Sequence, residues 1–351
     1  MVDHPEADGH ELVQWVRDPK SGLHAIIALH STARGPAFGG CRMWPYPSEA
    51  QALTDALRLS KGMTCKAAIL ELPLGGGKTV VIGDPARDKT PALLHALAAA
   101  IERLNGRYII ADDVGTTIED LAVMRQVTRH TAAATQAART PLAVTAYGVF
   151  QAIRAAVLHR WGKTGLAGLS AAVQGLGHVG LPLCGHLRDA GADLVVADLN
   201  PQRTTEAMER FGATVVEPDS IFAQPVDLLA PCALGDVLDD RTIPQLQAKV
   251  VCGGANNQLG LARHDAMLAK RDILYVPDYI ANAGGVVDFD QEQRDDRPEA
   301  VLAAVARIHD VALEVLRRAE AAGLTPLAIA DRMVAERLRP PEKVPPASAA
   351  A

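Results

Sequence analysis

Several features that would place a chain in a specialised class are scarce in these 351 residues. Aromatic residues make up only 4% of the sequence, and no apolar run approaches the length of a membrane span. The N-terminus has neither the basic segment nor the apolar segment of a secretory signal. The net charge is -6 and basic residues form no block, which argues against nucleic acid and anionic membranes as partners. These absences leave a soluble globular protein as the expectation.

Cysteine is also sparse. The five cysteines are odd in number, scattered along the chain, and never arranged as Cys-x-x-Cys. This pattern predicts reduced thiols in a cytoplasmic protein, with neither a disulfide framework nor a metal site. The length suggests two domains, each with its own core, and the abundant alanine and glycine favour helices packed closely on strands.

Two lysines between residues 63 and 84 stand in apolar sequence. Lys66 precedes Ala-Ala-Ile-Leu, and Lys78 lies between three glycines and Thr-Val-Val-Ile. A partly desolvated lysine loses its proton more easily, and the glycines let a ligand or another backbone approach Lys78. Two ordinary interpretations compete with this one. Gly-Lys-Thr suggests a phosphate-binding loop, although Leu72 stands where that motif needs glycine; alternatively, both lysines extend from strand ends into solvent.

The first half of the chain predicts a mixed α/β unit. The expected elements are a β-hairpin over 11–17 and 23–30, a glycine-rich loop over 35–42, a helix that is capped by Ser48 and ends at Lys61-Gly62, a strand over 74–82, a helix over 90–104 and a buried strand over 108–111. Asp112 and Asp113 follow that last strand, just before a helix that begins at Ile118. Carboxylates at such a place suit catalysis, but an aspartate pair there also serves as a simple helix cap.

The second half contains a dinucleotide-binding signature. A strand over 169–174 leads into Gly175-Leu176-Gly177-His178-Val179-Gly180, and a helix over 181–190 and a strand over 192–197 follow. Gly175 permits the turn, Gly177 lets backbone N–H groups reach a pyrophosphate, and Gly180 allows close packing of helix and strand. Asp198, 23 residues after Gly175, is placed to bind ribose hydroxyls and to repel a 2′-phosphate. NAD is therefore expected in preference to NADP.

Further strands are expected over 214–216, 226–230, 250–252 and 273–276, and helices over 299–322 and 326–338. Asn256, Asn257 and Asn282 lie in loops that follow two of these strands. Loops after the carboxyl ends of parallel strands bind the ligands of open sheets, so these asparagines are candidates for the nicotinamide side of a site. A single buried asparagine, however, more often holds its own loop together.

Eight segments together resemble the Glu/Leu/Phe/Val amino-acid dehydrogenases, most closely their leucine and phenylalanine branch. The resemblance extends from about residue 35 to residue 288. It is carried by Gly-Gly-Cys-Arg-Met-Trp at 39–44, Lys-Gly-Met-Thr-x-Lys at 61–66, Leu-Gly-Gly-Gly-Lys-Thr at 74–79, Asp-Val-Gly-Thr at 113–116, Thr-Ala-Tyr-Gly-Val at 145–149, the nucleotide loop, Gly-Ala-Asn-Asn at 254–257 and Asn-Ala-Gly-Gly at 282–285.

The resemblance implies NAD-dependent, reversible oxidative deamination of an apolar L-amino acid to a 2-oxo acid, ammonia and NADH. It implies that Lys66 binds the substrate carboxylate, Lys78 activates the attacking water, and Asp113 relays protons to the departing nitrogen. The other substrate contacts that it implies are Phe38, Gly40, Met63, Asn257 and Phe289. The implied cofactor contacts are Thr145, Gly175, Leu176, Gly177, His178, Val179, Gly180, Asp198, Cys232, Ala233, Asn256 and Asn282.

The substrate side chain stays open at this point. Relatives commonly have leucine where Phe38 stands and smaller or aliphatic residues where Phe289 stands, so this pocket is either narrower or offers a ring for stacking. We favour a branched aliphatic substrate, with phenylalanine or tryptophan as rivals. A non-catalytic nucleotide-binding regulator is the alternative from another class.

The implied fold has two α/β domains with a cleft between them. Residues 1–138 form the substrate-binding and oligomerisation domain, and residues 139–325 form a Rossmann domain that binds NAD. Helices over 326–338 are expected to pack back on the first domain, and 339–351 to be a disordered tail. We expect a homo-oligomer whose cleft closes by hinge motion near Thr140.

Overall fold

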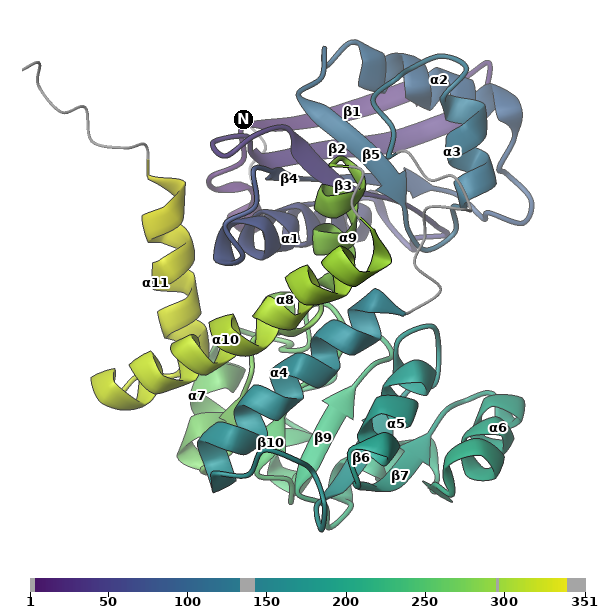
Figure 1. The fold of residues 1–351 in the computed structure, drawn as a ribbon. Helices are drawn as coiled ribbons and strands as arrows, with labels where there is room; N and C mark the ends of the chain where they lie inside the picture. Colours follow the sequence, from purple (N-terminus) through teal and green to yellow (C-terminus); the bar gives the residue numbers. More distant parts are fainter. Residues whose placement is uncertain (1–3, 133–142, 295–296, 340–351) are drawn as a thin grey trace, which may run out of the picture.

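The computed structural model describes residues 4–132, 143–294 and 297–339. These residues form two α/β domains with a band of helices between them (Figure 1), so the predicted fold class is confirmed. The boundary proposed between residues 138 and 139, the hinge expected near Thr140, and all but the first residue of the expected tail lie outside the described residues.

The first domain contains a five-stranded sheet in the order β1-β2-β4-β3-β5. The strands are β1 (Leu12–Asp18), β2 (Leu23–Ser31), β3 (Ala37–Trp44), β4 (Gly75–Ile82) and β5 (Tyr108–Asp112). β1 and β2 form the predicted antiparallel hairpin, whereas β4, β3 and β5 run parallel to one another. The carboxyl ends of these three parallel strands therefore meet at one edge of the sheet, where Asp113 follows β5.

Helices cover both faces of this sheet. Strand β2 is apolar almost throughout because its two faces are both buried. Ile26 and Ala28 face helix α1 (Glu49–Ile69), while Ile27 and Leu29 belong to the core on the opposite face, together with residues of α2 (Pro91–Glu102). A shorter helix, α3 (Ile118–Met124), begins with a capping box in which Thr117 and Asp120 bond each other's backbone N–H groups.

Two local predictions in this domain are wrong. The helix expected to end at Lys61-Gly62 continues to Ile69, because burial of its last turns outweighs the cost of about 1 kcal/mol for an internal glycine. The segment expected to be a glycine-rich loop contains strand β3. A Cβ on Gly39 would lie 1.8 Å from the Gly77 carbonyl oxygen, so this glycine serves close packing of neighbouring strands and does not form a turn.

The second domain contains a six-stranded parallel sheet in the order β11-β10-β9-β6-β7-β8. The strands are β6 (Ser170–Gln174), β7 (Asp193–Ala197), β8 (Thr214–Val215), β9 (Leu228–Pro231), β10 (Val250–Val251) and β11 (Leu274–Tyr275). Counted from β6, this is the 3-2-1-4-5-6 order of dinucleotide-binding sheets. The strand order reverses between β6 and β9, which is where such a sheet binds its ligand. The helices here are α4 (Val144–Trp161), α5 (Gly180–Asp189), α6 (Pro201–Phe211) and α7 (Arg263–Lys270).

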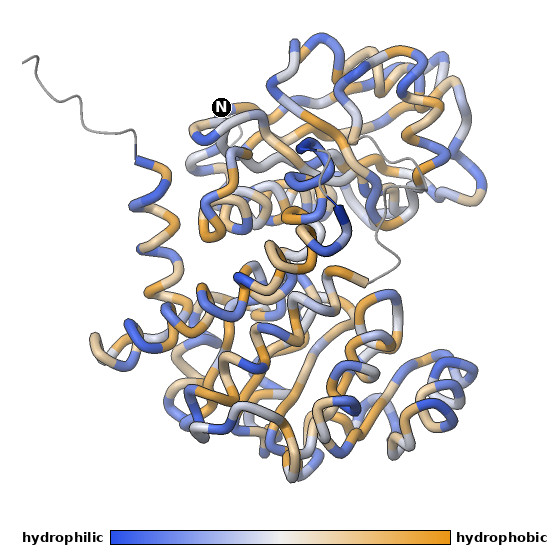
Figure 2. Tube along the Cα trace, in the orientation of Figure 1, coloured by the Kyte–Doolittle hydropathy of each residue, from blue (hydrophilic) through white to orange (hydrophobic). Residues whose placement is uncertain are grey.

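Four helices connect the two domains: α8 (Asp278–Ala281), α9 (Gly284–Glu292), α10 (Pro298–Ala322) and α11 (Pro326–Leu338). Helix α10 alternates between hydrophobic and hydrophilic residues along its length (Figure 2), and its apolar side packs on α4. Helix α11 lies against α1, where Arg337 forms an ion pair with Glu71 at 2.9 Å and donates to the Ile69 carbonyl. Among the described helices, none combines the length and apolar character needed to cross a bilayer.

Candidate active site

A cleft of about 850 Å³ lies between the two domains and brings together most of the predicted site residues. The first domain contributes residues from β3, α1, β4 and the end of β5, and the second contributes the glycine-rich loop, two asparagines and the ends of α4 and α9. The predicted residues that line it are Phe38, Gly40, Met63, Lys66, Lys78 and Asp113 from the first domain, and Thr145, Leu176, Gly177, His178, Val179, Asn256, Asn282 and Phe289 from the remainder.

Lys78 and Asp113 form an ion pair in this cleft. Lys78 Nζ lies 2.5 Å from Asp113 Oδ2, and Arg42 Nε donates to the same oxygen over 3.1 Å. Burial disfavours the charged carboxylate, but Lys78 and Arg42 outweigh it and hold the pKa of Asp113 well below its usual range. Asp113 is therefore ionised at neutral pH. Arg42 is itself fixed from behind, because its Nη1 donates to Asp55 Oδ2 over 2.9 Å.

Lys78 reaches this position from the middle of a strand. It stands on the face of β4 that α1 covers, and a Cβ on Gly76 of the same face would lie 2.1 Å from the Thr64 backbone nitrogen. The glycine thus lets α1 cross β4 closely, which buries Lys78 to 5% exposure. Gly40 is equally confined, since a Cβ there would lie 3.2 Å from Lys78 Nζ. Because Gly-Lys-Thr lies within a strand, no phosphate-binding loop is formed.

Lys66 lies on α1 and is only 8% exposed. Its Nζ donates to Asn256 Oδ1 over 2.8 Å, a contact that joins the two domains. Burial is the largest cause of a pKa lowered to about 8; the charge of Lys78 acts in the same direction and Asp278 opposes it. Neither lysine extends into solvent, so the interpretation of strand-end lysines is wrong for this chain.

Asn256 and Asn282 form a small amide network on the second wall. Asn282 Nδ2 donates to Asn256 Oδ1 over 2.9 Å, so this one oxygen accepts from both the asparagine and Lys66. Asn282 Oδ1 is buried and has no hydrogen-bond partner among the described residues. A buried acceptor without a partner is costly, and a ligand N–H group in the cleft would satisfy it.

The glycine-rich loop has the shape of a pyrophosphate cradle. Gly175 has a positive φ of 87°, and a Cβ on it would lie 2.7 Å from the Ala233 Cβ across the switch point. A Cβ on Gly180 would lie 1.8 Å from the Gly175 carbonyl oxygen, so only glycine lets α5 start this close to β6. The space around Gly177 is open among the described residues, and the nearest atom to a Cβ there is in the Arg203 guanidinium, at 4.0 Å. The loop therefore leaves room for a diphosphate at the start of α5.

Asp198 follows β7 at the far end of this loop. Its Oδ2 accepts from the Leu176 backbone N–H over 2.6 Å, and its Oδ1 accepts from that of Asn200 over 2.8 Å. Arg203 on α6 lies 3.8 Å from the same carboxylate. These bonds fix the acid beside the loop and leave lone pairs for the hydroxyls of a ribose.

Phe38 and Phe289 close the apolar end of the cleft. Their rings stack with centroids 3.9 Å apart and planes 9° apart, although one belongs to β3 and the other to α9. Both are buried, at 6% and 5% exposure. The pair forms a flat apolar wall that leaves less room for a side chain than two aliphatic residues would.

Some predicted residues lie outside the lining of this cleft. Gly175, Gly180, Cys232 and Ala233 are packed together beneath the loop, where a Cβ on Gly180 would lie 3.2 Å from the Cys232 Cβ. Asn257 lines a neighbouring cavity instead, in a left-handed conformation with φ of 52°. Among the described residues no group of three or more His, Cys, Asp or Glu side chains is placed to hold a metal ion.

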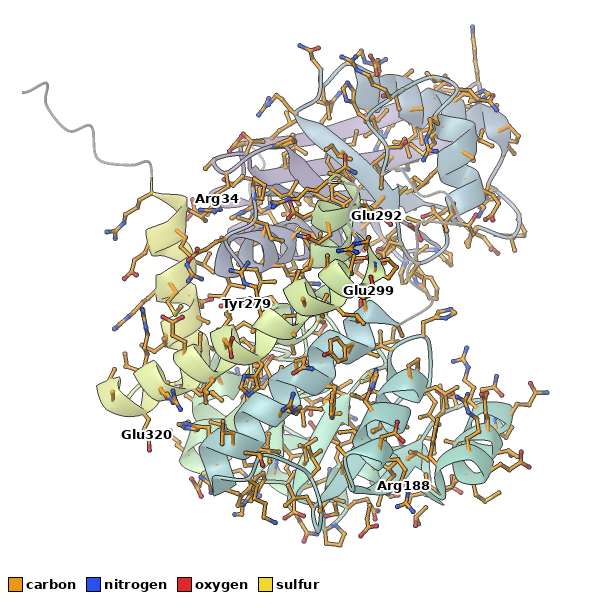
Figure 3. The ribbon with its side chains drawn as sticks, in the orientation of Figure 1. Arg34, Arg188, Tyr279, Glu292, Glu299 and Glu320 are labelled. Carbon is orange, nitrogen blue, oxygen red and sulfur yellow. The ribbon has the colours of Figure 1, made fainter. Side chains whose placement is uncertain are left out.

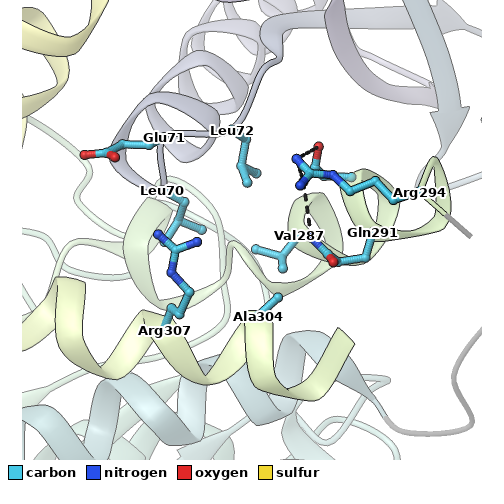
Figure 4. Close-up of a pocket in the computed structure, with 9 residues that line it drawn as sticks. Leu70, Glu71, Leu72, Val287, Gln291, Arg294, Ala304 and Arg307 are labelled. Carbon is cyan, nitrogen blue, oxygen red and sulfur yellow. Dashed lines mark hydrogen bonds and ion pairs between the residues drawn. The ribbon is translucent and has the colours of Figure 1, made fainter. Parts of the chain in front are cut away.

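Another cavity, of about 290 Å³, lies where the turn after α1 meets α9 and α10 (Figure 4). Arg294 forms an ion pair there with Asp290 at 2.9 Å. Its lining consists of Leu70, Glu71, Leu72, Val287, Asp290, Gln291, Arg294, Ala304 and Arg307. No predicted site residue is in this set, so we assign the chemistry to the larger cleft.

Three charged residues near the site have no role that the sequence predicts: Arg42, Asp278 and Arg203. Arg42 holds Asp113, Asp278 influences Lys66, and Arg203 reaches both Asp198 and the glycine-rich loop. The sequence does mark Arg42 as unusual, because it is the one charged residue in the otherwise apolar segment from 37 to 44. Nothing local distinguishes Asp278 or Arg203 from ordinary surface charges.

Comparison with known proteins identifies the family. Residues 10–130 match the model of the Glu/Leu/Phe/Val dehydrogenase dimerisation domain, and residues 195–297 match that of the glutamate/leucine/phenylalanine/valine dehydrogenases. A leucine dehydrogenase of Thermoactinomyces intermedius is 46% identical over 341 residues, which cover 96% of this chain and 93% of that protein. The chain belongs to the Glu/Leu/Phe/Val dehydrogenase family.

Other members of the family are similar across nearly the whole chain. A phenylalanine dehydrogenase of Bacillus thermotolerans is 43% identical, covering 94% of this chain and 88% of that protein. The crystal structure of L-tryptophan dehydrogenase from Nostoc punctiforme matches with a TM-score of 0.79 and 43% identity, covering 94% of this chain and 97% of that one. The predicted enzyme class, an amino-acid dehydrogenase that acts by oxidative deamination, is confirmed, and the alternative of a non-catalytic regulator is not retained.

Proposed function

We propose that this enzyme converts an apolar L-amino acid and NAD, reversibly, into the 2-oxo acid, ammonia and NADH. One observation carries the proposal. Lys66, Lys78 and Asp113 converge from the first domain on a cleft whose other wall holds a glycine-rich dinucleotide loop. A carboxylate anchor, a base and a proton relay are what deamination requires beside a hydride acceptor.

Lys66 is suited to bind the substrate carboxylate. It is buried, cationic at neutral pH, and held by a single amide oxygen that a carboxylate could replace. A charged hydrogen bond in such a site is stronger than one in water. The carboxylate bound there would direct the substrate Cα toward Lys78 and Asp113.

The proton transfers use the Lys78–Asp113 pair. NAD, when bound beside Cα, would supply the hydride acceptor that the oxidation of the substrate amine to an iminium group needs. Lys78 then takes a proton from water as the water oxygen bonds to Cα, and passes that proton across its 2.5 Å contact to Asp113. Asp113 delivers it to the substrate nitrogen, and Lys78, neutral again after that transfer, takes the remaining hydroxyl proton as the C–N bond breaks. Ammonia then leaves and the carbonyl group of the 2-oxo acid remains.

NAD is the proposed cofactor. The open space at Gly177 and the tight packing at Gly175 and Gly180 fit its pyrophosphate, and the unpartnered Asn282 Oδ1 fits the carboxamide N–H of nicotinamide. Asp198 supports NAD over NADP because its charge would oppose a 2′-phosphate. The positive charge of Arg203, 3.8 Å from Asp198, weakens this repulsion of a 2′-phosphate. Turnover should therefore be measured with both NAD and NADP.

A branched aliphatic side chain fits the cleft best. The stacked pair of Phe38 and Phe289 narrows the apolar end, which favours a leucine-like or valine-like group. An aromatic substrate is the second candidate, because the rings offer a stacking surface if they separate, and relatives include phenylalanine and tryptophan dehydrogenases.

The test is NADH production with a panel of L-amino acids and with NAD or NADP as acceptor. We expect leucine, isoleucine and valine to give the highest kcat/KM, with NAD preferred. Higher values for phenylalanine or tryptophan would select the second candidate. No turnover with any amino acid would contradict the proposal.

We further propose a cytoplasmic homo-oligomer assembled through the first domain. The family model that matches residues 10–130 is described as a dimerisation domain, and the five cysteines are free. Sedimentation of the purified enzyme measures the assembly, and a monomer at assay concentration would contradict this part of the proposal.

A further inference from the structure

A second cavity reaches the two lysines from another side. It has a volume of about 190 Å³ and lies between α1, α8 and α11. Met63, Lys66, Lys78 and Asn256 line both this cavity and the main cleft. These four residues therefore border both spaces, and the hydrogen bond from Lys66 to Asn256 lies where the two spaces adjoin.

The cavity extends from the lysines to the protein surface. Tyr279, labelled in Figure 3, lies on α8 and donates to Asp331 Oδ1 of α11 over 2.8 Å. Asp331 and Lys61 are exposed and mark the outer end. Asp278 lies further in, where its Oδ1 accepts from the Tyr279 backbone N–H over 2.8 Å. The space thus leads from solvent, past two carboxylates and a phenol, to the proposed base.

The chemistry of the lining suits a small, neutral and polar molecule. Carboxylates and amide oxygens accept hydrogen bonds, while lysine and arginine groups donate them, and neither sign of charge dominates. The lining residues are Glu6, Arg58, Leu59, Lys61, Gly62, Met63, Cys65, Lys66, Lys78, Asn256, Asn257, Asp278, Tyr279 and Asp331. Ammonia and water each donate and accept hydrogen bonds, so both fit such a mixed surface.

The volume of the second cavity also suits molecules as small as ammonia and water. One water molecule occupies about 30 Å³ of liquid, so the cavity holds a short file of about six such molecules and is too small for a dinucleotide. The larger ligands fill the main cleft during turnover. Deamination nevertheless requires one water to enter and one ammonia to leave at Lys78 while those ligands are in place.

We propose that the second cavity is the passage by which ammonia and water reach and leave the reacting carbon. This inference rests on the proposed function, since a deaminating reaction is what supplies and consumes these molecules. Lys66 and Asn256 form the inner gate, and the Tyr279–Asp331 pair forms the outer one. In the reverse direction, ammonia enters by this passage to attack the 2-oxo acid.

Gly62 offers a way to block the passage without altering a proposed catalytic group. It lines the cavity, and a Cβ on it would meet no atom within 4 Å. The test uses Gly62→Cys in the intact enzyme, labelled after folding with a reagent that adds either an S-methyl or an S-benzyl disulfide. The small label is the matched control for the large one, and reductant reverses both. Labelled wild type controls for reaction at native cysteines.

Reductive amination gives the decisive measurement. We expect the benzyl label to raise the KM for ammonium about tenfold or more, while the KM values for the 2-oxo acid and NADH change less than about twofold. The methyl label should have little effect, and reductant should restore the original values. An unchanged KM for ammonium, or an equal rise in all three KM values, would overturn the passage. Wild type without turnover would instead contradict the proposed function itself.

Discussion

The two walls of the cleft differ in how they are built. The first-domain wall carries buried charges that are already paired, with Lys78 and Arg42 both on one oxygen of Asp113. The second-domain wall carries backbone N–H groups of a glycine-rich loop and the uncharged amides of Asn256 and Asn282, and charged residues such as Arg203 and Glu206 also line it. The Lys78–Asp113 pair can move protons, whereas amides and backbone N–H groups bind and orient a ligand.

This difference assigns chemistry to one domain and cofactor binding to the other. Within the cleft lining, the hydrogen bond from Lys66 to Asn256 links the two walls. Outside that lining, Arg58 of the first domain also pairs with Asp236 of the second at 3.1 Å. Substitutions in either wall should therefore have separable effects, one on turnover and the other on affinity for the dinucleotide.

Lys78→Ala should give the largest effect. Removing the proposed base should lower kcat about 10³-fold or more, because general base catalysis contributes on this scale. Affinity for NAD should remain within about twofold, since Lys78 belongs to the charged wall. Stopped-flow turnover and fluorescence titration with NADH measure the two quantities.

Lys89→Ala is the matched control for this substitution. Lys89 is also a first-domain lysine paired with a carboxylate, Asp120 at 2.6 Å, but it does not line the cleft. Its loss should leave kcat within about threefold, because neither Lys89 nor Asp120 lines the cleft. Near-normal turnover of Lys78→Ala would remove the proposed base, and loss of NAD affinity would show that the walls are not separable.

Asp198→Ala tests the other wall. The loss of charged hydrogen bonds to the ribose should raise the KM for NAD about 10- to 100-fold while kcat changes little. Discrimination against NADP should fall as well, since Arg203 remains nearby without its carboxylate partner. Asp193→Ala is the control, because that acid is 85% exposed and sits at the opposite end of β7. A fall in kcat with KM unchanged would contradict the division between the walls.

The two walls also differ in how much of them the sequence predicts. The glycine-rich loop, its flanking strand and helix, and Asp198 are contiguous, so their spacing alone specifies their arrangement. The strand order that places this loop at a switch point was not predicted, but each strand of that sheet was expected near its observed position.

The charged wall is less predictable because it depends on tertiary packing. Apolar neighbours marked Lys66 and Lys78 as unusual, yet their meeting requires α1 to continue past Gly62 and to cross β4 at Gly76, and the first of these was predicted wrongly. The stacking of Phe38 on Phe289 also joins distant segments. Such contacts follow from how the domains pack, which local propensity does not encode.

The smallest expected effect concerns the pH at which Lys66 stops binding carboxylates. With its pKa lowered to about 8 by burial, Lys66 should lose its charge as the pH rises through 8. The inhibition constant of an apolar monocarboxylate should therefore be flat below pH 8 and should rise about tenfold per pH unit above it. An inhibitor without an amino group keeps the substrate amine from titrating in the same range.

Asp278→Asn sharpens this prediction. The negative charge of Asp278 favours protonated Lys66, so its removal should lower the pKa of Lys66 further and move the break in the profile to lower pH, by about one unit. The amide keeps an oxygen to accept from the Tyr279 backbone N–H. Asp265→Asn is the matched control. Asp265 accepts a hydrogen bond from Thr325 and does not line the cleft, so its change to an amide should leave the pH of the break unchanged. A profile without a break between about pH 7 and pH 9.5, or a shift toward higher pH in Asp278→Asn, would mean that the carboxylate is anchored elsewhere.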